Sequence, residues 1–201
     1  MQSHQKSSIG NEAIKEYMDM YYHTPSNFED FVYVGLVMQG QGMKHGLEAH
    51  RRNRPFCMGT LYWQLNDSWP VVSWSGVDYY NNWKAMHYKA RDVFAPIALN
   101  VYQEDGVMEI YTLSDELADA NNLTLRLSLI DFKGEVIKQN KQQVAVKANA
   151  SEKVYSIAVA DFATTAQQEN SVVNAQLIDS TGEAIATSNY FFYWPNKLKL
   201  P

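Results

Sequence analysis

The stretch Leu123-Thr124-Leu125-Arg126-Leu127-Ser128-Leu129 decides the fold of the larger part of this chain. Its leucines alternate strictly with polar residues, and successive side chains of a β-strand point to opposite faces of a sheet. The pattern therefore predicts a strand with one buried face and one face in water. We expect all four leucines to point into a single core.

Similar short apolar segments lie on both sides of this strand. Residues 97–103 and 108–114 flank Asp105-Gly106, a dipeptide typical of a two-residue hairpin turn. Further strands are expected at residues 135–146, 153–159, 173–177 and near 189–193. About seven short strands in about 100 residues favour an immunoglobulin-like antiparallel β-sandwich. We assign it to residues 96–194 and expect residues 195–201 to be a linker to a further module.

The first 95 residues have a mostly helical pattern. Helices are expected at residues 11–22, from 28 towards Arg51 and Arg52, and at 82–94. Ser26 and Glu29 have the spacing of a capping box at the start of the second helix. Residues 57–65 are a continuous apolar run, which is typical of a strand buried on both faces in a parallel sheet. A buried strand, a long loop and a helix make a βα fragment, which is too little for a complete α/β domain.

Composition excludes several classes of function. Apolar residues make up 46% and charged residues 19%, as in a folded globular protein, and the net charge is −5. This charge provides no basic surface for nucleic acid or an anionic membrane, so we expect neither as a partner. The single cysteine, Cys57, cannot form an internal disulfide and is expected to be a buried apolar residue. No Cys and His residues have metal-ligand spacing, and we expect no cofactor.

The N-terminal residues are polar, and no hydrophobic segment follows them. We therefore expect neither a signal peptide nor a membrane anchor in this sequence, and the compartment of the protein is unknown.

One stretch combines an apolar run with a cluster of ring and amide side chains. It is Gly59-Thr60-Leu61-Tyr62-Trp63-Gln64-Leu65-Asn66-Asp67-Ser68-Trp69-Pro70. Sugars need this combination, because their C–H faces pack on aromatic rings while their hydroxyl groups need fixed donors and acceptors. We expect Trp63 to contact a sugar, and Asn66 and Asp67 to be weaker candidates that support it. Trp69, Trp74 and Trp83 are instead expected to be core residues.

Residues 59–70 resemble the last barrel strand of family 2 β-mannosidases. Trp74-Ser75-Gly76-Val77-Asp78-Tyr79-Tyr80-Asn81-Asn82-Trp83-Lys84-Ala85-Met86-His87-Tyr88, followed by Phe94-Ala95-Pro96, resembles the closing helix of the same barrel. Upstream, Val37-Met38-Gln39-Gly40-Gln41-Gly42 and Arg51-Arg52-Asn53-Arg54 resemble the preceding barrel helix. The likeness is densest over residues 32–96, and related exo-glucosaminidases share its outline.

The resemblance implies a fold and an activity. The family has a (β/α)8 barrel followed by β-sandwich domains, and it hydrolyses terminal β-mannose with retention through two glutamates. Residues 1–95 would then be the C-terminal portion of the barrel, and both glutamates would lie upstream of Met1. Trp63 corresponds to the tryptophan that lines the subsite for the terminal sugar, and no catalytic residue is expected in this chain.

The resemblance also implies partners for the chain. These are a β-mannoside oligosaccharide as substrate and the missing upstream and downstream domains. The exposed edges of an incomplete barrel also favour packing against the sandwich or self-association of the fragment.

Two alternatives to this interpretation remain open. The sugar could be β-glucosamine, β-galactose or β-glucuronic acid, although no obvious cation is present for a glucuronide. The chain could also be a non-catalytic carbohydrate-binding or scaffolding module. Asn11-Glu12 matches the dipeptide that carries the family's acid/base, but it opens a helix instead of ending a strand. We therefore expect Glu12 to be a first-turn carboxylate that the helix dipole favours.

Overall fold

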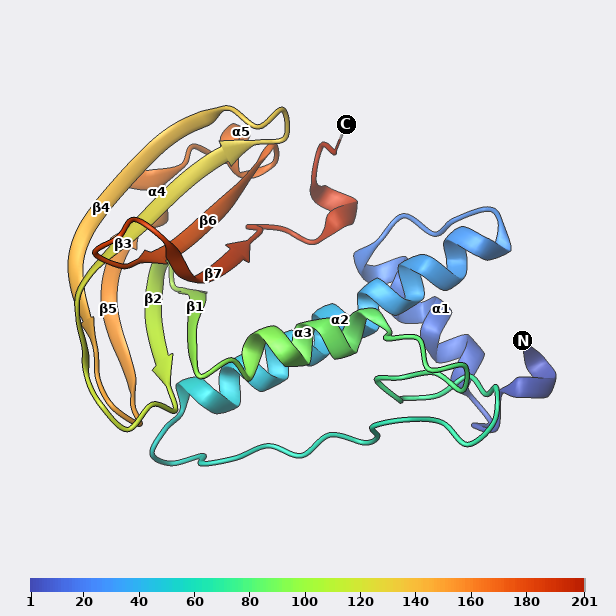
Figure 1. Cartoon of the computed structure of the whole chain (residues 1–201). Helices are drawn as coiled ribbons and strands as arrows, with labels where there is room; N and C mark the ends of the chain where they lie inside the picture. Colours follow the sequence, from blue (N-terminus) through green and yellow to red (C-terminus); the bar gives the residue numbers. More distant parts are fainter. Residues whose placement is uncertain (201) are drawn as a thin grey trace. The chain divides into compact units, whose positions relative to one another are not determined.

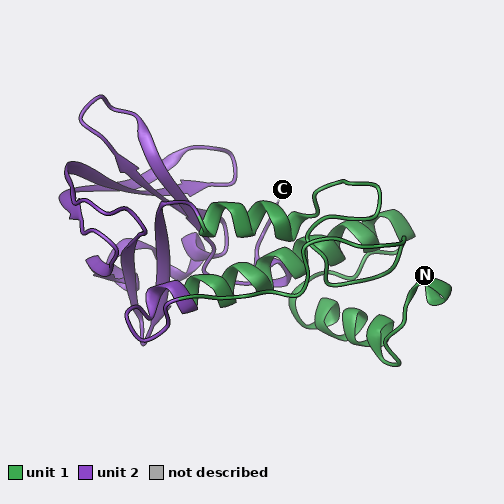
Figure 2. Ribbon diagram, turned by 60° about the horizontal axis from the view of Figure 1, so that its bottom comes forward, with its two compact units in different colours: residues 1–49, 59–94 green, residues 50–58, 95–201 purple. Residues whose placement is uncertain are grey.

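The computed structural model describes residues 1–200, which form two compact units (Figure 2). The first unit comprises residues 1–49 and 59–94, and the second comprises residues 50–58 together with the chain from Ala95 onward. The second unit therefore contains a short segment that precedes the sandwich by about 40 residues of sequence.

The second unit is an antiparallel β-sandwich with a three-stranded and a four-stranded sheet (Figure 1). The first sheet contains, in spatial order, β1 (Ile97–Glu104), β2 (Val107–Ser114) and β5 (Ser151–Ala158). The second contains β4 (Val136–Val146), β3 (Ala120–Asp131), β6 (Ser171–Ile178) and β7 (Ala184–Tyr190). Two short helices, α4 (Val159–Phe162) and α5 (Thr165–Gln168), connect β5 to β6. The predicted antiparallel sandwich is confirmed.

The core of this unit contains the predicted leucines of β3. Leu123, Leu125, Leu127 and Leu129 are all at most 4% exposed. On the neighbouring strand β6, Val173, Ala175 and Leu177 are fully buried and lie opposite Leu129, Leu127 and Leu125. Because both strands have period two, every second residue of each contributes to the same apolar layer.

The ends of the sandwich differ in detail from the prediction. Asp105 and Gly106 both have positive φ, of 48° and 76°, as the expected hairpin turn requires. The last strand is β7, which ends at Tyr190, so the prediction of a strand near 189–193 was placed too late. The expected linker begins with a 3-10 helix, Pro195–Lys197, and Leu198 is buried. Lys199 donates its backbone N–H to the Glu169 carbonyl at 2.8 Å, so this segment is attached to the sandwich.

Arginine side chains hold residues 50–58 to the sandwich. Arg51 is buried and pairs with Asp115 at 2.9 Å. The Arg52 guanidinium donates to the Asn100 side chain at 2.7 Å and lies 3.8 Å from the centre of the Tyr102 ring. The arginines expected to favour a helix C-terminus therefore also bind directly to β1 and to the residue that follows β2.

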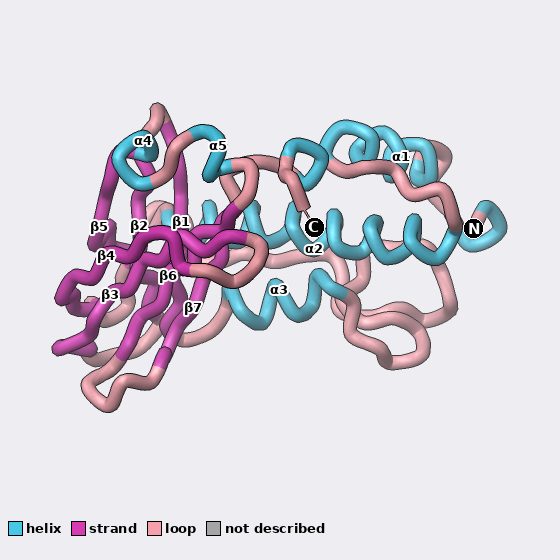
Figure 3. Tube along the Cα trace, turned by 90° about the horizontal axis from the view of Figure 1, so that it is seen from above, coloured by secondary structure: helices cyan, strands magenta, loops and turns pink. Residues whose placement is uncertain are grey.

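The first unit contains three α-helices and a long segment without regular secondary structure (Figure 3). The helices are α1 (Gly10–Tyr21), α2 (Phe28–Arg52, whose last three residues belong to the second unit) and α3 (Ala85–Val93), and a 3-10 helix (Gln2–His4) precedes them. All three predicted helices are confirmed, although α3 is shorter than expected. Within residues 1–200, no helix is both long and apolar enough to cross a membrane.

The predicted cap of α2 was wrong by one residue. Asn27, not Ser26, directly precedes the helix, and its Oδ1 accepts a hydrogen bond from the Asp30 backbone N–H at 2.9 Å. The Asn27 amide in turn donates to the Asp30 carboxylate at 2.7 Å. This reciprocal pair satisfies a free backbone donor at the helix start, as a capping box does.

The prediction of a buried strand at residues 57–65 is wrong for this chain. The segment has no regular secondary structure, Leu61 is 99% exposed, and Cys57 is only half-buried. A central strand needs a hydrogen-bonded neighbour on each side. Within residues 1–200 no strand pairs with this segment, and an isolated bridge joins the next residue, Asn66, to Val77. Within the described residues the run is therefore not part of a sheet.

Truncation of a core leucine should destabilise the sandwich. We expect Leu127→Ala to reduce the free energy of unfolding by about 2–5 kcal/mol, because it leaves a cavity between the sheets. Leu117→Ala is the matched control, since Leu117 is 91% exposed and its loss should change stability by less than about 0.5 kcal/mol. Urea unfolding followed by the β-sheet circular dichroism signal measures both. Equal midpoints would contradict the assignment of Leu127 to the core.

Candidate functional site

The candidate site lies on residues 63–67, at the end of the apolar run at 57–65. Backbone hydrogen bonds fix the position of this segment. The Gly76 N–H donates to the carbonyls of Gln64 at 3.0 Å and Leu65 at 3.1 Å. The Val77 N–H donates to the Leu65 carbonyl at 2.8 Å. The Lys84 N–H then donates to the Gly76 carbonyl at 2.9 Å, directly before α3. Residues 64–65 are therefore held through 76–77 to the start of a helix.

Trp63 lies just before this fixed point and is 74% exposed. Its neighbour Tyr62 is half-buried and packs against a small apolar cluster of Leu47, Ala90 and Val93. The peptide bond between Trp63 and Gln64 is cis. An exposed indole ring whose neighbours are anchored is a suitable surface for the C–H face of a sugar.

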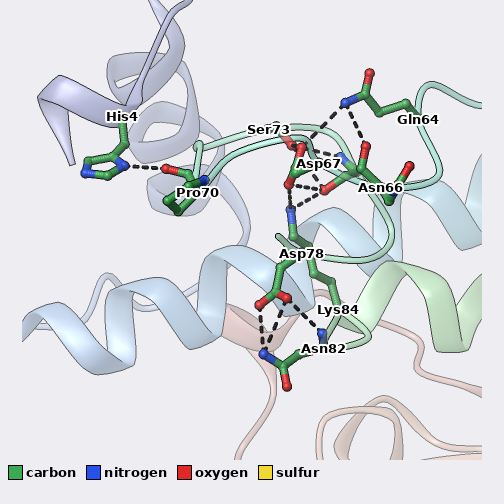
Figure 4. A network of polar contacts seen from close by, with 10 residues as sticks. His4, Gln64, Asn66, Asp67, Pro70, Ser73, Asp78, Asn82 and Lys84 are labelled. Atoms are coloured by element: carbon green, nitrogen blue, oxygen red, sulfur yellow. Dashed lines mark hydrogen bonds and ion pairs between the residues drawn. The ribbon is translucent and has the colours of Figure 1, made fainter. Parts of the chain in front are cut away.

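Asp67 does not face solvent, since its side chain is only 2% exposed. Figure 4 shows Asp67 next to Ser73 and Lys84. The Ser73 hydroxyl donates to its Oδ1 at 2.5 Å, and the Ser75 hydroxyl donates to its Oδ2. The Lys84 ammonium lies 3.3 Å from Oδ2 and also donates to the Ser75 hydroxyl oxygen at 2.6 Å. Burial raises the pKa of the Asp67 carboxyl, but these hydrogen bonds and the Lys84 charge outweigh it and hold the pKa below its ordinary value.

Asn66 lies between these two environments. It is exposed, and its backbone carbonyl accepts a hydrogen bond from the Gln64 side chain at 3.1 Å. The structure thus places the three predicted residues on one short segment but gives them different surroundings. Trp63 and Asn66 are open to solvent, whereas Asp67 is enclosed by the groups that it binds.

The prediction that the other three tryptophans are core residues was wrong. Trp74 is 61% exposed, Trp83 is 46% exposed and Trp69 is 38% exposed. Trp69 stacks on His4 with ring centroids 5.9 Å apart, and Trp83 makes an edge contact with His87 at 4.5 Å. Trp74 lies between Ser73 and Ser75, whose hydroxyls both bind Asp67.

Sequence reasoning also missed the roles of Lys84, Ser73 and Ser75. All three lie within or beside the segments that resemble the barrel end. A lysine 17 residues after Asp67 carries no periodic signal that would pair the two.

A tight turn carries two more exposed rings. The Asp78 carboxylate accepts a hydrogen bond from the Asn82 backbone N–H at 2.8 Å, and the Asp78 N–H donates to the Asn82 carbonyl at 2.9 Å. Tyr79 and Tyr80 lie between these residues, are both exposed, and pack edge to face with centroids 5.2 Å apart. Asp78 therefore serves to close the turn.

The acidic side chains of Glu12, Asp67 and Asp78 each have a structural role. Glu12 lies in the first turn of α1, as expected, and does not end a strand. Asp67 is enclosed and Asp78 closes a turn. Within residues 1–200, no group of three or more His, Cys, Asp and Glu side chains is arranged to hold a metal ion.

Comparison with known proteins identifies the relatives of this chain. A family profile described as a mannosidase Ig/CBM-like domain matches residues 106–199. The β-mannosidase of Capra hircus is 31% identical over 199 residues, covering 91% of this chain and 23% of its own length. The β-mannosidase A of Aspergillus clavatus is 31% identical over 176 residues, covering 80% of this chain and 19% of its own length.

Solved structures extend the similarity to the whole chain. The β-D-mannosidase from Dictyoglomus thermophilum matches with a TM-score of 0.89 and 27% identity, covering 100% of this chain and 24% of that protein. The exo-chitosanase of Amycolatopsis orientalis matches with a TM-score of 0.81 and 21% identity over 94% of this chain and 23% of its own length, and shows the same fold. The chain spans about a quarter of the length of the relatives it matches. As such a segment, it belongs to the β-mannosidases of glycoside hydrolase family 2.

Proposed function

We propose that this chain is the part of an exo-acting, retaining β-mannosidase that contributes the Trp63 sugar platform but not the catalytic glutamates. The whole enzyme would hydrolyse terminal β-D-mannose from oligosaccharides. One observation carries the proposal: Trp63 is 74% exposed on an anchored segment, in a chain 31% identical over 91% of its length to a β-mannosidase.

The domain organisation is part of the same proposal. Residues 1–95 would be the C-terminal portion of a (β/α)8 barrel, and residues 96–194 would be the sandwich that follows it. The exposure of Met58, Leu61 and Leu65 in the apolar run supports this assignment, because a barrel strand loses both neighbours when the rest of the barrel is absent. Residues 195–201 would lead to a further domain, and the upstream and downstream parts of the enzyme would be the partners of this segment.

The chemistry assigns different tasks to different parts of the enzyme. Retaining hydrolysis requires one acid to protonate the leaving oxygen and one carboxylate to attack the anomeric carbon. The acidic groups near Trp63 are engaged elsewhere, since Asp67 binds Lys84 and Asp78 closes a turn. This segment would therefore bind and orient the terminal sugar, while the reacting carboxylates come from upstream.

The charges beside Trp63 favour a neutral sugar. A glucosaminide carries an ammonium group that requires a carboxylate, and a glucuronide carries a carboxylate that requires a cation. The buried Asp67–Lys84 pair uses both charges internally. Uncharged mannose needs neither a carboxylate nor a cation. Hydrolysis of aryl β-mannosides in preference to β-glucosaminides, β-galactosides and β-glucuronides would support this choice.

Mannose binding by the isolated sandwich would instead favour a non-catalytic carbohydrate-binding module.

Replacement of Trp63 tests the sugar platform. In the full-length enzyme that contains this segment, Trp63→Ala should lower kcat/KM for an aryl β-mannoside by about ten- to a hundredfold. That factor corresponds to a loss of roughly 1–3 kcal/mol in transition-state binding. Trp63→Phe is the matched control, because it retains an aromatic face and should lose less. If Trp63→Ala left the kinetics unchanged, Trp63 would not belong to the site.

The isolated chain should be inactive. Because both reacting carboxylates would come from upstream, the 201-residue chain should not hydrolyse an aryl β-mannoside, even at high concentration and from mildly acidic to neutral pH. Release of the aryl group, measured by absorbance, provides the assay, and the full-length enzyme is the positive control. Hydrolysis by the purified chain would mean that Glu12, Asp67 or Asp78 has a catalytic role.

A further inference from the structure

A buried ion pair lies four residues from the candidate sugar platform. The side chains of Asp67 and Lys84 are 2% and 11% exposed, and the two charges are 3.3 Å apart. Removing a carboxylate and an ammonium group from water is costly, and such a pair needs further hydrogen bonds to offset that cost. Here the Ser73 and Ser75 hydroxyls provide them.

This network joins three separate parts of the chain. Asp67 follows the Trp63 segment, Ser73 and Ser75 belong to the next loop, and Lys84 directly precedes α3 (Figure 4). The helix itself is anchored through its buried residues Met86, Ala90 and Val93. A continuous set of contacts therefore runs from α3 to the segment that carries the exposed ring.

The residue before Trp63 is anchored as well. Tyr62 packs on Leu47, Ala90 and Val93, and its hydroxyl lies 3.4 Å from the His87 ring nitrogen. The backbone around Trp63 is thus held on one side by apolar packing against α2 and α3. On the other side it is held by the charged network, and both anchors converge on α3.

We infer that Asp67 and Lys84 are positioning residues, which hold the Trp63 segment in place for the sugar without contacting the sugar themselves. This inference rests on the proposed function of Trp63. A carboxylate that accepts hydrogen bonds from two hydroxyls and an ammonium group fixes direction as well as distance, which apolar packing does not do. The same two serine bonds fix the backbone on both sides of Trp74, so the position of this second exposed ring depends on Asp67 too.

Kinetics of the full-length enzyme test the inference. Lys84→Met and Asp67→Asn should each lower kcat/KM for an aryl β-mannoside by about ten- to a hundredfold, because a small misplacement of a positioning group has effects of this size. The double variant should be little worse than either single variant, since each change disrupts the same network. Lys84→Arg retains the charge and should recover part of the loss. Lys147→Met is the matched control, because it removes the lysine of an exposed pair in the sandwich, and it should have no effect.

A direct readout of ring position separates positioning from a general loss of structure. The 201-residue chain contains five tryptophans, so fluorotryptophan labelling gives five fluorine NMR signals, which single Trp→Phe variants assign. In Lys84→Met and Asp67→Asn, the signals of Trp63 and Trp74 should shift or broaden. The Trp194 signal and the far-ultraviolet circular dichroism spectrum should stay unchanged. If one variant fails to fold, the other provides the test.

The outcomes distinguish this inference from the proposed function. If Trp63→Ala reduces activity but the Asp67 and Lys84 variants retain wild-type kinetics and fluorine spectra, the positioning role is overturned and the sugar platform stands. If Trp63→Ala has no effect, the sugar platform itself is overturned, and the positioning role falls with it. Reduced activity in all three variants, with displaced Trp63 signals, supports both.

Discussion

Every backbone N–H and C=O group needs a hydrogen-bond partner, and this requirement governs the structure of the chain. The sandwich meets this need internally, because each of its two sheets pairs its own strands. Residues 57–65 belong to neither sheet, and the side chains of Met58, Leu61, Trp63 and Leu65 are exposed. Order returns at residues 64–66, where the loop at 76–77 supplies hydrogen bonds. The candidate site lies at this point, where backbone hydrogen bonds fix the end of a segment without regular secondary structure.

Asp67 shows how the same requirement acts on a side chain. A buried carboxylate is costly unless donors surround it, and here the donors come from Ser73, Ser75 and Lys84. By binding these donors, Asp67 holds three segments of the chain together next to the segment that carries Trp63. Asp67, which the sequence analysis expected to support a sugar contact, is enclosed by its donors, whereas the Trp63 side chain is exposed.

The sandwich could be predicted because its signal is local. Alternation from Leu123 to Leu129 follows from the geometry of one strand and needs no knowledge of other segments. The run at 57–65 was wrongly predicted as a strand, since an apolar composition alone does not show whether neighbouring strands are present to pair with it. The role of Lys84 was not predicted for a related reason. Its ion pair with Asp67 joins residues 17 positions apart, and such a pair produces no periodic pattern in the sequence. The three tryptophans were misassigned because composition does not reveal which side of a loop faces water.

The three arginines that follow residue 50 have a consequence for how such proteins can change in evolution. These arginines bind groups that lie 44 to 64 positions later in the sequence, namely the carbonyls of Ala95 and Ser114 and the side chains of Asn100 and Asp115. A gene fusion that exchanged the sandwich at residue 95 would separate these arginines from Asn100, Ser114 and Asp115. Recombination would therefore preserve the fold only if both sequence blocks were inherited together, so the sandwich and the end of α2 should behave as one unit of inheritance.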